Sequence, residues 1–329
     1  MNLPLRLFTK FRFLLFCLVL PLFLLSFSGC FSSTTIDDQK TRSQSDGDDF
    51  FNLANNLINR NKIAPALIAL DEAYNSYSLL DDVSGKSKVL LKKVTLFAAT
   101  NETEKGDSIL SAELLILPSK TDTINLINSL TEFYYNTKRY DSVLAVTAKF
   151  NTSYLEHPKA LIAIAYLALT KFALGQNIEM ELANLNRAFV AFERDKIYPP
   201  DQLGFAYYTR AFISREKGDL NDAEFWGMKA WDKDLQNEDY QALAYDLELL
   251  AKIAEAKADF SGAAGLYKRA SDSYNALGIE RESVFCEVKS LLLRLKEDKN
   301  NSFLINRLKF LRDKITDAVL IQETDILLK

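Results

Sequence analysis

The amino-acid sequence predicts an all-α protein in which consecutive helical hairpins stack into a solenoid. From Asp49 onward, apolar residues recur every three or four positions almost without a break, and no stretch shows the sustained alternation of a half-buried strand. The 7 Pro and 11 Gly residues are few for 329 positions, and many of them fall between helical stretches rather than inside them. Small residues also repeat at a fixed interval, because Ala183, Ala223 and Ala263 are each separated by 40 positions.

Composition narrows the classes of function. With 48% hydrophobic residues the chain can bury a sizeable core, and a net charge of −4 lacks the basic excess that nucleic-acid binding requires, so we expect no nucleic-acid partner. A single His and 3 Cys exclude a disulfide-dense scaffold and a cysteine-based zinc site. We therefore expect no metal and no cofactor.

The first element, residues 1–29, has the order of a secretory signal. Three basic residues, Arg6, Lys10 and Arg12, precede an apolar run over 13–27, and the small residues Ser28 and Gly29 follow. The run is shorter than the ~20 residues that span a bilayer and is interrupted by Pro21, which favours a cleaved signal. A retained membrane anchor is the alternative.

Phe27-Ser28-Gly29-Cys30 resembles the bacterial lipobox, although the family usually has an aliphatic residue where Phe27 stands. The resemblance implies cleavage before Cys30, whose thiol carries the lipid, with palmitate among the acyl chains. Because no Asp follows the cysteine, it also implies sorting to the outer membrane with the body in the periplasm. Removing three basic residues leaves an acidic body, so the acyl chains would hold the protein at the membrane. An ordinary secretory signal is the alternative.

Residues 30–48 are polar, carry one large aliphatic side chain, and are predicted to form a flexible tether after the lipidated cysteine. The Asp46-Gly47-Asp48 cluster is interpreted as linker and helix cap, because Phe50 would occupy a ligand position of a calcium loop. After loss of Cys17 and lipidation of Cys30, Cys286 would remain alone, and we interpret it as a packed small residue.

Residues 49–275 contain the internal repeat. One segment, with Tyr207, Ala211, Gly218, Leu220, Ala223 and Ala230, matches a second segment with Leu247, Ala251, Ala258, Phe260, Ala263 and Ala270. Antiparallel helices approach closely only where the crossing side chains are small, so the repeated spacing of Ala and Gly predicts a repeated helix crossing. The same spacing is found near the start of this region, with small residues at Ala54, Ala66 and Ala73.

This pattern resembles the tetratricopeptide repeat family, whose unit is a helix-turn-helix with small residues at set places. Three units match well, a fourth around 127–143 keeps the aromatic positions but has Thr131 and Phe150 in place of small residues, and two around 96–115 and 164–188 are degenerate. The resemblance implies an α–α superhelix of about six hairpins. The stretches 280–296, 302–315 and 316–328 lack the repeat pattern, so residues 276–329 are predicted to cap the solenoid. An irregular helical bundle is the alternative.

The sequence contains few candidate catalytic residues. The single histidine, His157, stands before Pro158 at a predicted turn, and no nucleophile elbow, phosphate loop or dinucleotide fingerprint occurs. Adjacent carboxylates such as Asp81 and Asp82 are expected to be solvated. We predict that the chain is not an enzyme.

The family resemblance implies that a ligand would lie on the concave face, which first-helix residues line. The positions that map there include amides, aromatic rings and charges of both signs, namely Asn128, Glu132, Tyr135, Asn136, Tyr208, Phe212, Arg215, Glu248, Lys252 and Glu255. Tyr208 and Phe212 are four residues apart and therefore share a helix face. Trp226 and Trp231 are expected on a second helix, in packing between repeats. The alternative is that the lining positions are simply solvent-facing.

The leading hypothesis is a membrane-anchored, periplasm-facing scaffold that binds a protein or peptide partner without catalysis. The alternative is a carrier for a small or hydrophobic ligand, such as an accessory of a solute-uptake system, which would need a closed apolar pocket. Helical repeat arrays also pack with one another, so a homo-oligomer is a third partner to consider.

Overall fold

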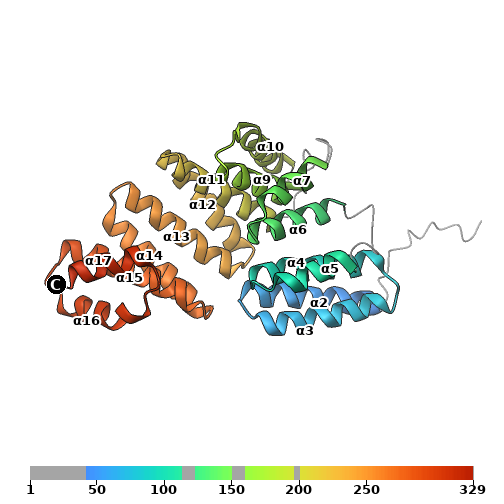
Figure 1. Cartoon of the computed structure of the whole chain (residues 1–329), viewed down its shortest axis with the longest axis horizontal. Helices are drawn as coiled ribbons and strands as arrows, with labels where there is room; N and C mark the ends of the chain where they lie inside the picture. The colour runs from blue at the N-terminus through green and yellow to red at the C-terminus, as the bar shows by residue number, and fades with distance from the viewer. Residues whose placement is uncertain (1–41, 113–122, 150–159, 196–200, 329) are drawn as a thin grey trace, which may run out of the picture. The chain divides into compact units, whose positions relative to one another are not determined.

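The computed structural model describes residues 42–112, 123–149, 160–195 and 201–328 (Figure 1). Cys30, Phe150 and His157 lie outside the described residues. Contacts divide the chain between Arg42 and Ser43, and residues 43–329 form one compact unit. Among the described helices, none has both the length and the apolar character needed to cross a membrane.

The described residues fold into α-helices with no β-strand, which confirms the predicted all-α class. The helices are α2 (Arg42–Asn59), α3 (Ile63–Ser78), α4 (Val83–Ala99), α5 (Thr103–Ala112), α6 (Thr123–Asn136), α7 (Tyr140–Lys149), α9 (Leu161–Ala173), α10 (Glu179–Asp195), α11 (Asp201–Glu216), α12 (Leu220–Gln236), α13 (Tyr240–Ala256), α14 (Phe260–Ala276), α15 (Glu280–Glu297), α16 (Ser302–Leu311) and α17 (Ala318–Leu327), with a short 3₁₀ turn, η3 (Arg312–Lys314), between the last two.

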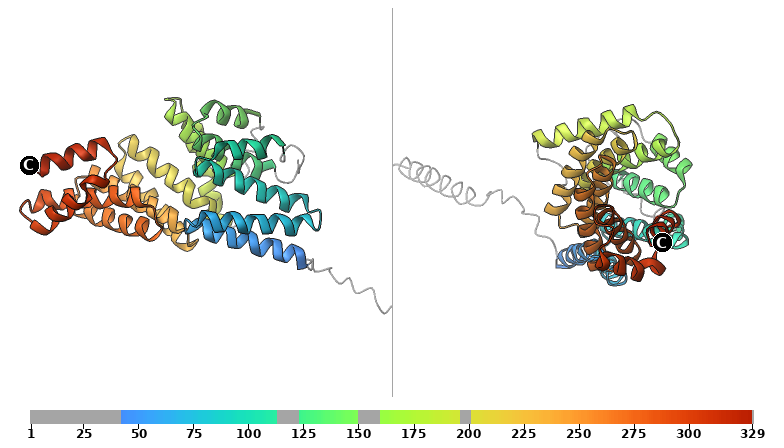
Figure 2. Two further views of the ribbon diagram at one scale, coloured as in Figure 1. Left: turned by 60° about the horizontal axis from the view of Figure 1, so that its bottom comes forward. Right: turned by 90° about the vertical axis from the view of Figure 1, so that its left-hand side faces the viewer.

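Helices pack mainly on their neighbours in the chain. Consecutive helices such as α11 and α12, α13 and α14, and α14 and α15 form the most extensive contacts. In addition, the first helices of successive pairs touch one another, α4 with α6, α6 with α9, and α9 with α11 (Figures 1 and 2). Contacts of α11 with α13 continue this succession, so the first helices of the pairs form a row from α4 to α13.

The first described helix starts earlier than the sequence pattern indicates. Helix α2 begins at Arg42, inside the stretch 30–48 that was predicted to be a flexible tether. Packing explains the difference, because a Cβ on Gly47 would lie 2.8 Å from the Tyr77 ring of α3, and the Tyr77 hydroxyl donates a 2.6 Å hydrogen bond to Asp48. Asp48 therefore pairs with the neighbouring helix and is not a free linker residue.

Three turns between helices share a local pattern. At Gly218, Glu238 and Ala258 a residue with positive φ comes after the helix, and an Asp follows it. The side chains of Asp219, Asp239 and Asp259 accept hydrogen bonds from backbone N–H groups three residues on, so they cap α12, α13 and α14. The sharp reversal and the immediate cap explain why such short connections suffice.

Small residues occupy the helix crossings, as the repeat pattern predicts. Ala211, Ala223, Ala230, Ala263 and Ala270 are all fully buried. Larger side chains fill the space between hairpins, and Trp226 packs on the rings of Phe189 and Tyr207 at centroid distances of 5.0 and 5.5 Å. Trp226 of α12 thus packs against the neighbouring hairpin through Phe189 of α10.

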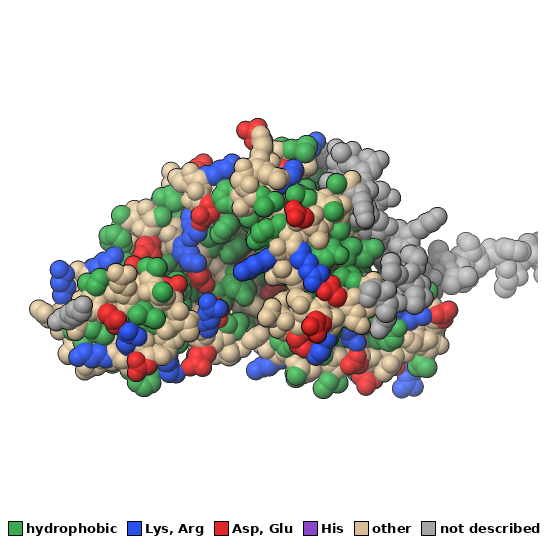
Figure 3. All heavy atoms as spheres, in the orientation of Figure 1, with side chains coloured by type: hydrophobic (Ala, Val, Ile, Leu, Met, Phe, Trp, Pro, Cys, Tyr) green, Lys and Arg blue, Asp and Glu red, His purple; other side chains and the backbone are tan. Residues whose placement is uncertain are grey.

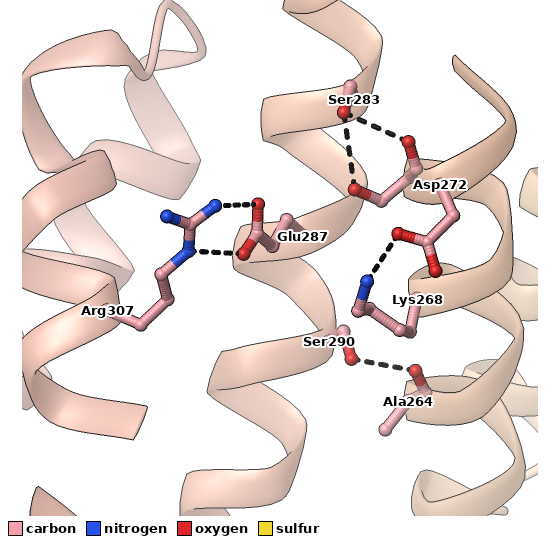
Figure 4. Close-up of polar contacts among 8 residues, drawn as sticks. Ala264, Lys268, Asp272, Ser283, Glu287, Ser290 and Arg307 are labelled. Atoms are coloured by element: carbon pink, nitrogen blue, oxygen red, sulfur yellow. Dashed lines mark hydrogen bonds and ion pairs between the residues drawn. The ribbon is translucent and has the colours of Figure 1, made fainter. Parts of the chain in front are cut away.

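Polar bonds join the C-terminal helices (Figure 4). On α15, Ser290 donates a 2.8 Å hydrogen bond to the Ala264 carbonyl of α14, and Glu287 forms a two-pronged ion pair with Arg307 of α16 at 2.5 and 2.8 Å. Cys286 is fully buried on the same helix, and burial raises the pKa of its thiol, which agrees with its interpretation as a packed small residue.

Candidate functional site

The candidate site is a surface formed by the first helix of each of four successive hairpins, α6, α9, α11 and α13. It consists of the half-buried side chains of these helices that are not covered by other helices, and we name it the first-helix face. The space-filling view shows hydrophobic side chains gathered in a hollow, bordered by Lys, Arg, Asp and Glu side chains (Figure 3). An apolar floor with a polar border is typical of recognition surfaces.

Aromatic rings run across this face from one helix to the next. The Tyr135 ring of α6 lies 5.7 Å from Tyr140 and 5.1 Å from Tyr166 of α9, and Tyr166 lies 4.6 Å from Phe205 of α11. Such centroid distances are those of attractive ring pairs. These four residues form one continuous aromatic band over three hairpins.

Tyr208 and Phe212 share one face of α11, as predicted from their spacing. Both are half-buried, and Phe212 contacts the edge of Phe172 at 6.4 Å and carries the Arg215 guanidinium over its ring at 5.6 Å. Burial, and then the negative charges of Glu248 and Asp246, raise the pKa of Tyr208. Its hydroxyl makes no hydrogen bond with any residue that the structure describes, so it is available to a ligand.

Four predicted lining residues of α6 have different surroundings. Asn136 is exposed, and Tyr135 belongs to the aromatic band. Asn128 is only 7% exposed and its side-chain oxygen accepts a 3.0 Å hydrogen bond from the Ala163 N–H, so it fastens α6 to α9 and does not line the face. Glu132 is half-buried without a hydrogen bond or ion pair in the described part of the chain, and burial raises its pKa.

The three charged residues predicted on α13 are engaged with their own neighbours. Glu248 accepts hydrogen bonds from Lys252 at 2.5 Å and from the Tyr274 hydroxyl at 2.7 Å. Glu255 accepts from the Tyr267 hydroxyl at 2.9 Å and from Lys289 at 2.8 Å. These side chains connect α13 to α14 and α15, so the available groups of the face are concentrated on α6, α9 and α11.

A buried carboxyl pair joins α12 and α13. Asp234 of α12 and Asp246 of α13 are 4% and 1% exposed and within hydrogen-bonding reach of each other. Neither oxygen of Asp246 receives a hydrogen bond from an N–H or O–H group of the described residues. Desolvation raises both pKa values, that of Asp234 to about 7. The charge of Asp239 raises both further, and the charge of Asp234 raises the pKa of Asp246, so the pair keeps a proton at neutral pH.

Other surface features do not coincide with the predicted site. One shallow depression lies on α12, lined by Glu224, Phe225, Met228 and Lys229 among others, and a second lies between α14 and α15. Within the described ranges, no group of three or more His, Cys, Asp or Glu residues has an arrangement that could hold a metal ion.

Sequence reasoning missed four aromatic residues around the face, Tyr166, Phe172, Phe205 and Tyr140. The first two lie in the degenerate unit around 164–188, where the repeat phase is weak, and Tyr166 is predominantly buried, so its position on the band comes from packing with Tyr135. It also missed the Asp234–Asp246 pair, because residues on two different helices carry no spacing signal.

No protein-family model matches the chain, and no curated protein matches it in sequence.

Proposed function

We propose that the chain is a lipid-anchored, periplasm-facing scaffold of the tetratricopeptide-repeat type that binds a protein or peptide partner on the first-helix face and performs no catalysis. The observation that supports this most is the row of aromatic residues on three successive first helices, half-buried at Tyr135 and Phe205 and buried at Tyr166, with the Tyr208 hydroxyl lacking a partner in the described structure. Rigid amphipathic rings provide contact area at low cost in side-chain entropy, which suits recognition of an extended or helical segment.

The repeat assignment rests on the residues at the helix crossings. Ala211 with Ala223 and Ala251 with Ala263 occupy equivalent places in two hairpins, and all four are fully buried. A stack whose members contact mainly their neighbours provides an elongated surface for a partner.

Photocrosslinking in intact cells tests the binding proposal. A photoreactive phenylalanine analogue replaces Tyr208 in one strain and the exposed Lys299 in a control strain. We expect a discrete protein captured at Tyr208 and absent at Lys299, and we expect Phe212→Ser to reduce its capture. If Tyr208 yields only self-adducts and a small molecule co-purifies with the protein, the scaffold proposal is wrong and the carrier alternative is supported. If Phe212→Ser does not change the capture, the partner does not bind on the first-helix face.

The anchor proposal has its own test. Cells are fed a labelled palmitate, and the protein is compared with the Cys30→Ser variant after membrane fractionation. We expect label and outer-membrane location in the unmodified chain, and loss of both in the variant. Label retained by Cys30→Ser, or an unlabelled chain, would contradict lipidation at this residue.

A further inference from the structure

Glu132 differs from Glu181, Glu248 and Glu255 in making no ion pair in the described part of the chain. Glu181 accepts from Lys171 at 2.6 Å, Glu248 from Lys252 at 2.5 Å, and Glu255 from Lys289 at 2.8 Å. Glu132 makes no such pair among the described residues, and Lys92 of α4, whose charge lowers the pKa of Glu132, forms no ion pair with it. Removing a carboxylate from water without a partner costs free energy, which a bound cation would recover.

The surroundings of Glu132 also favour a positive charge. Tyr135 lies one turn further along α6, and its ring is 5.1 Å from the ring of Tyr166 on α9. The charge of Glu132 is close enough to raise the pKa of Tyr166. Ring faces are electrostatically negative, so a carboxylate and two rings together attract a cation and disfavour an anion.

The chemistry of the cation follows from the apolar floor beside this acid. A hydrated metal ion needs several oxygen ligands, and the described residues hold no group of three acids placed for one. A lysine or arginine side chain instead has an apolar stem that can lie on the rings while its charged end reaches the carboxylate.

Resting on the proposed function, we propose that Glu132, with the rings of Tyr135 and Tyr166, binds a lysine or arginine side chain of the partner segment. The aromatic residues further along the face, Phe205, Tyr208 and Phe212, then take the apolar side chains beside it. The partner is accordingly a segment in which a basic residue neighbours hydrophobic ones.

Selection from a display library of random twelve-residue peptides tests this inference. The full chain, purified in detergent, is compared with Glu132→Gln, which keeps the side-chain size, and with the control Glu323→Gln on the exposed surface of α17. A charge-assisted contact of this kind corresponds to about a tenfold preference. We expect peptides with Lys or Arg beside hydrophobic residues to be enriched about tenfold by the unmodified chain and by the control, and the basic preference to disappear with Glu132→Gln.

A third variant separates this inference from the proposed function. If Tyr208→Ala abolishes peptide enrichment, the face binds peptides. The role of Glu132 is then wrong if the peptides enriched by the unmodified chain show no preference for basic residues, or if Glu132→Gln keeps that preference. If the unmodified chain enriches no peptide, or its enrichment is the same with Tyr208→Ala, the peptide-binding face and the role of Glu132 are both wrong. Thermal melting of each variant checks that a lost preference is not lost folding.

Discussion

At the scale of single residues, the turns show where local backbone strain is stored. Equivalent turns have Gly218 at φ 83° and Ala258 at φ 61°, and a Cβ at Gly218 would meet no described atom within 4 Å. A residue with a Cβ loses about 1–2 kcal/mol in the left-handed region, and glycine avoids this cost. Part of the advantage is offset because glycine gives the unfolded chain more conformational freedom.

These two positions give a matched pair of substitutions. We expect Ala258→Gly to raise the free energy of unfolding by about 0.5–1 kcal/mol and Gly218→Ala to lower it by a similar amount. Urea unfolding followed by circular dichroism measures both. Changes of the same sign in the two variants would show that backbone strain is not what distinguishes these turns.

The Asp234–Asp246 pair makes stability depend on pH. Both pKa values are raised in the folded protein, that of Asp234 to about 7, relative to about 4 for an unfolded Asp, so the folded state holds more protons in this window. The free energy of unfolding therefore decreases as pH rises from about 4 to 7. Asp239, the cap of α13, has a pKa raised by burial and contributes in the same direction.

We expect Asp246→Asn to remove the part of this dependence that comes from the pair, because an amide donates to the Asp234 carboxylate without a shared proton. The variant should be more stable than the unmodified chain by about 2 kcal/mol at pH 8 and nearly equal to it at pH 5. Thermal melts across this range provide the comparison, with the exposed Asp232→Asn on α12 as control. Parallel pH profiles for the unmodified chain and Asp246→Asn would rule out the shared proton.

At the scale of helices, the stack depends on close crossings. Ala211 of α11 is fully buried in a cluster with Ala223 of α12 and with Leu249 and Ile253 of α13. A larger side chain there must displace two neighbouring helices, since both contribute to the cluster.

We expect Ala211→Leu to destabilise the protein by about 1–3 kcal/mol through overpacking. The matched control is Ala256→Leu at the exposed end of α13, where we expect a change within about 0.5 kcal/mol. Chemical denaturation reads out both. Tolerance of leucine at residue 211 would mean that the small side chain is not what sets the distance between α11, α12 and α13.

At the scale of the whole molecule, contacts between distant hairpins are few but present. The Asn61 side chain, in the turn after α2, donates a 3.2 Å hydrogen bond to the Leu277 carbonyl after α14, and the Arg60 guanidinium lies 5.7 Å from the Tyr240 ring centre. A stack with only neighbour contacts would lack both. This junction joins the first and sixth hairpins of the described unit.

We expect Asn61→Gly to release this junction while keeping the positive φ of 54°. Loss of one hydrogen bond, about 1 kcal/mol, corresponds to roughly fivefold faster amide exchange at residues 60–62 and 277–279. Asn101→Gly is the matched control, because Asn101 has φ 62° in the turn between α4 and α5 and makes no bond to another described hairpin. Equal effects of the two substitutions on residues 277–279 would refute the junction.

The residue pattern alone predicts the helical class, the position of many turns and the small residues at the crossings. These follow from local and periodic requirements: a 3.6-residue repeat of apolar side chains, a residue tolerant of positive φ before an Asp cap, and Ala wherever helices touch. The same pattern also placed Tyr208 and Phe212 on one helix face.

Which of the predicted lining residues are available depends instead on the tertiary structure. Asn128 accepts a hydrogen bond from the Ala163 N–H, and Glu248 accepts hydrogen bonds from Lys252 and Tyr274. Glu132, in contrast, has no hydrogen-bond or ion-pair partner among the described residues. The interaction of Asp234 with Asp246 and the hydrogen bond from Asn61 to Leu277 likewise join residues that no regular spacing in the sequence relates. The physical reason is that burial and hydrogen bonding depend on which helices become neighbours in space, and a pattern within one helix holds no information about the side chains that another helix brings to it.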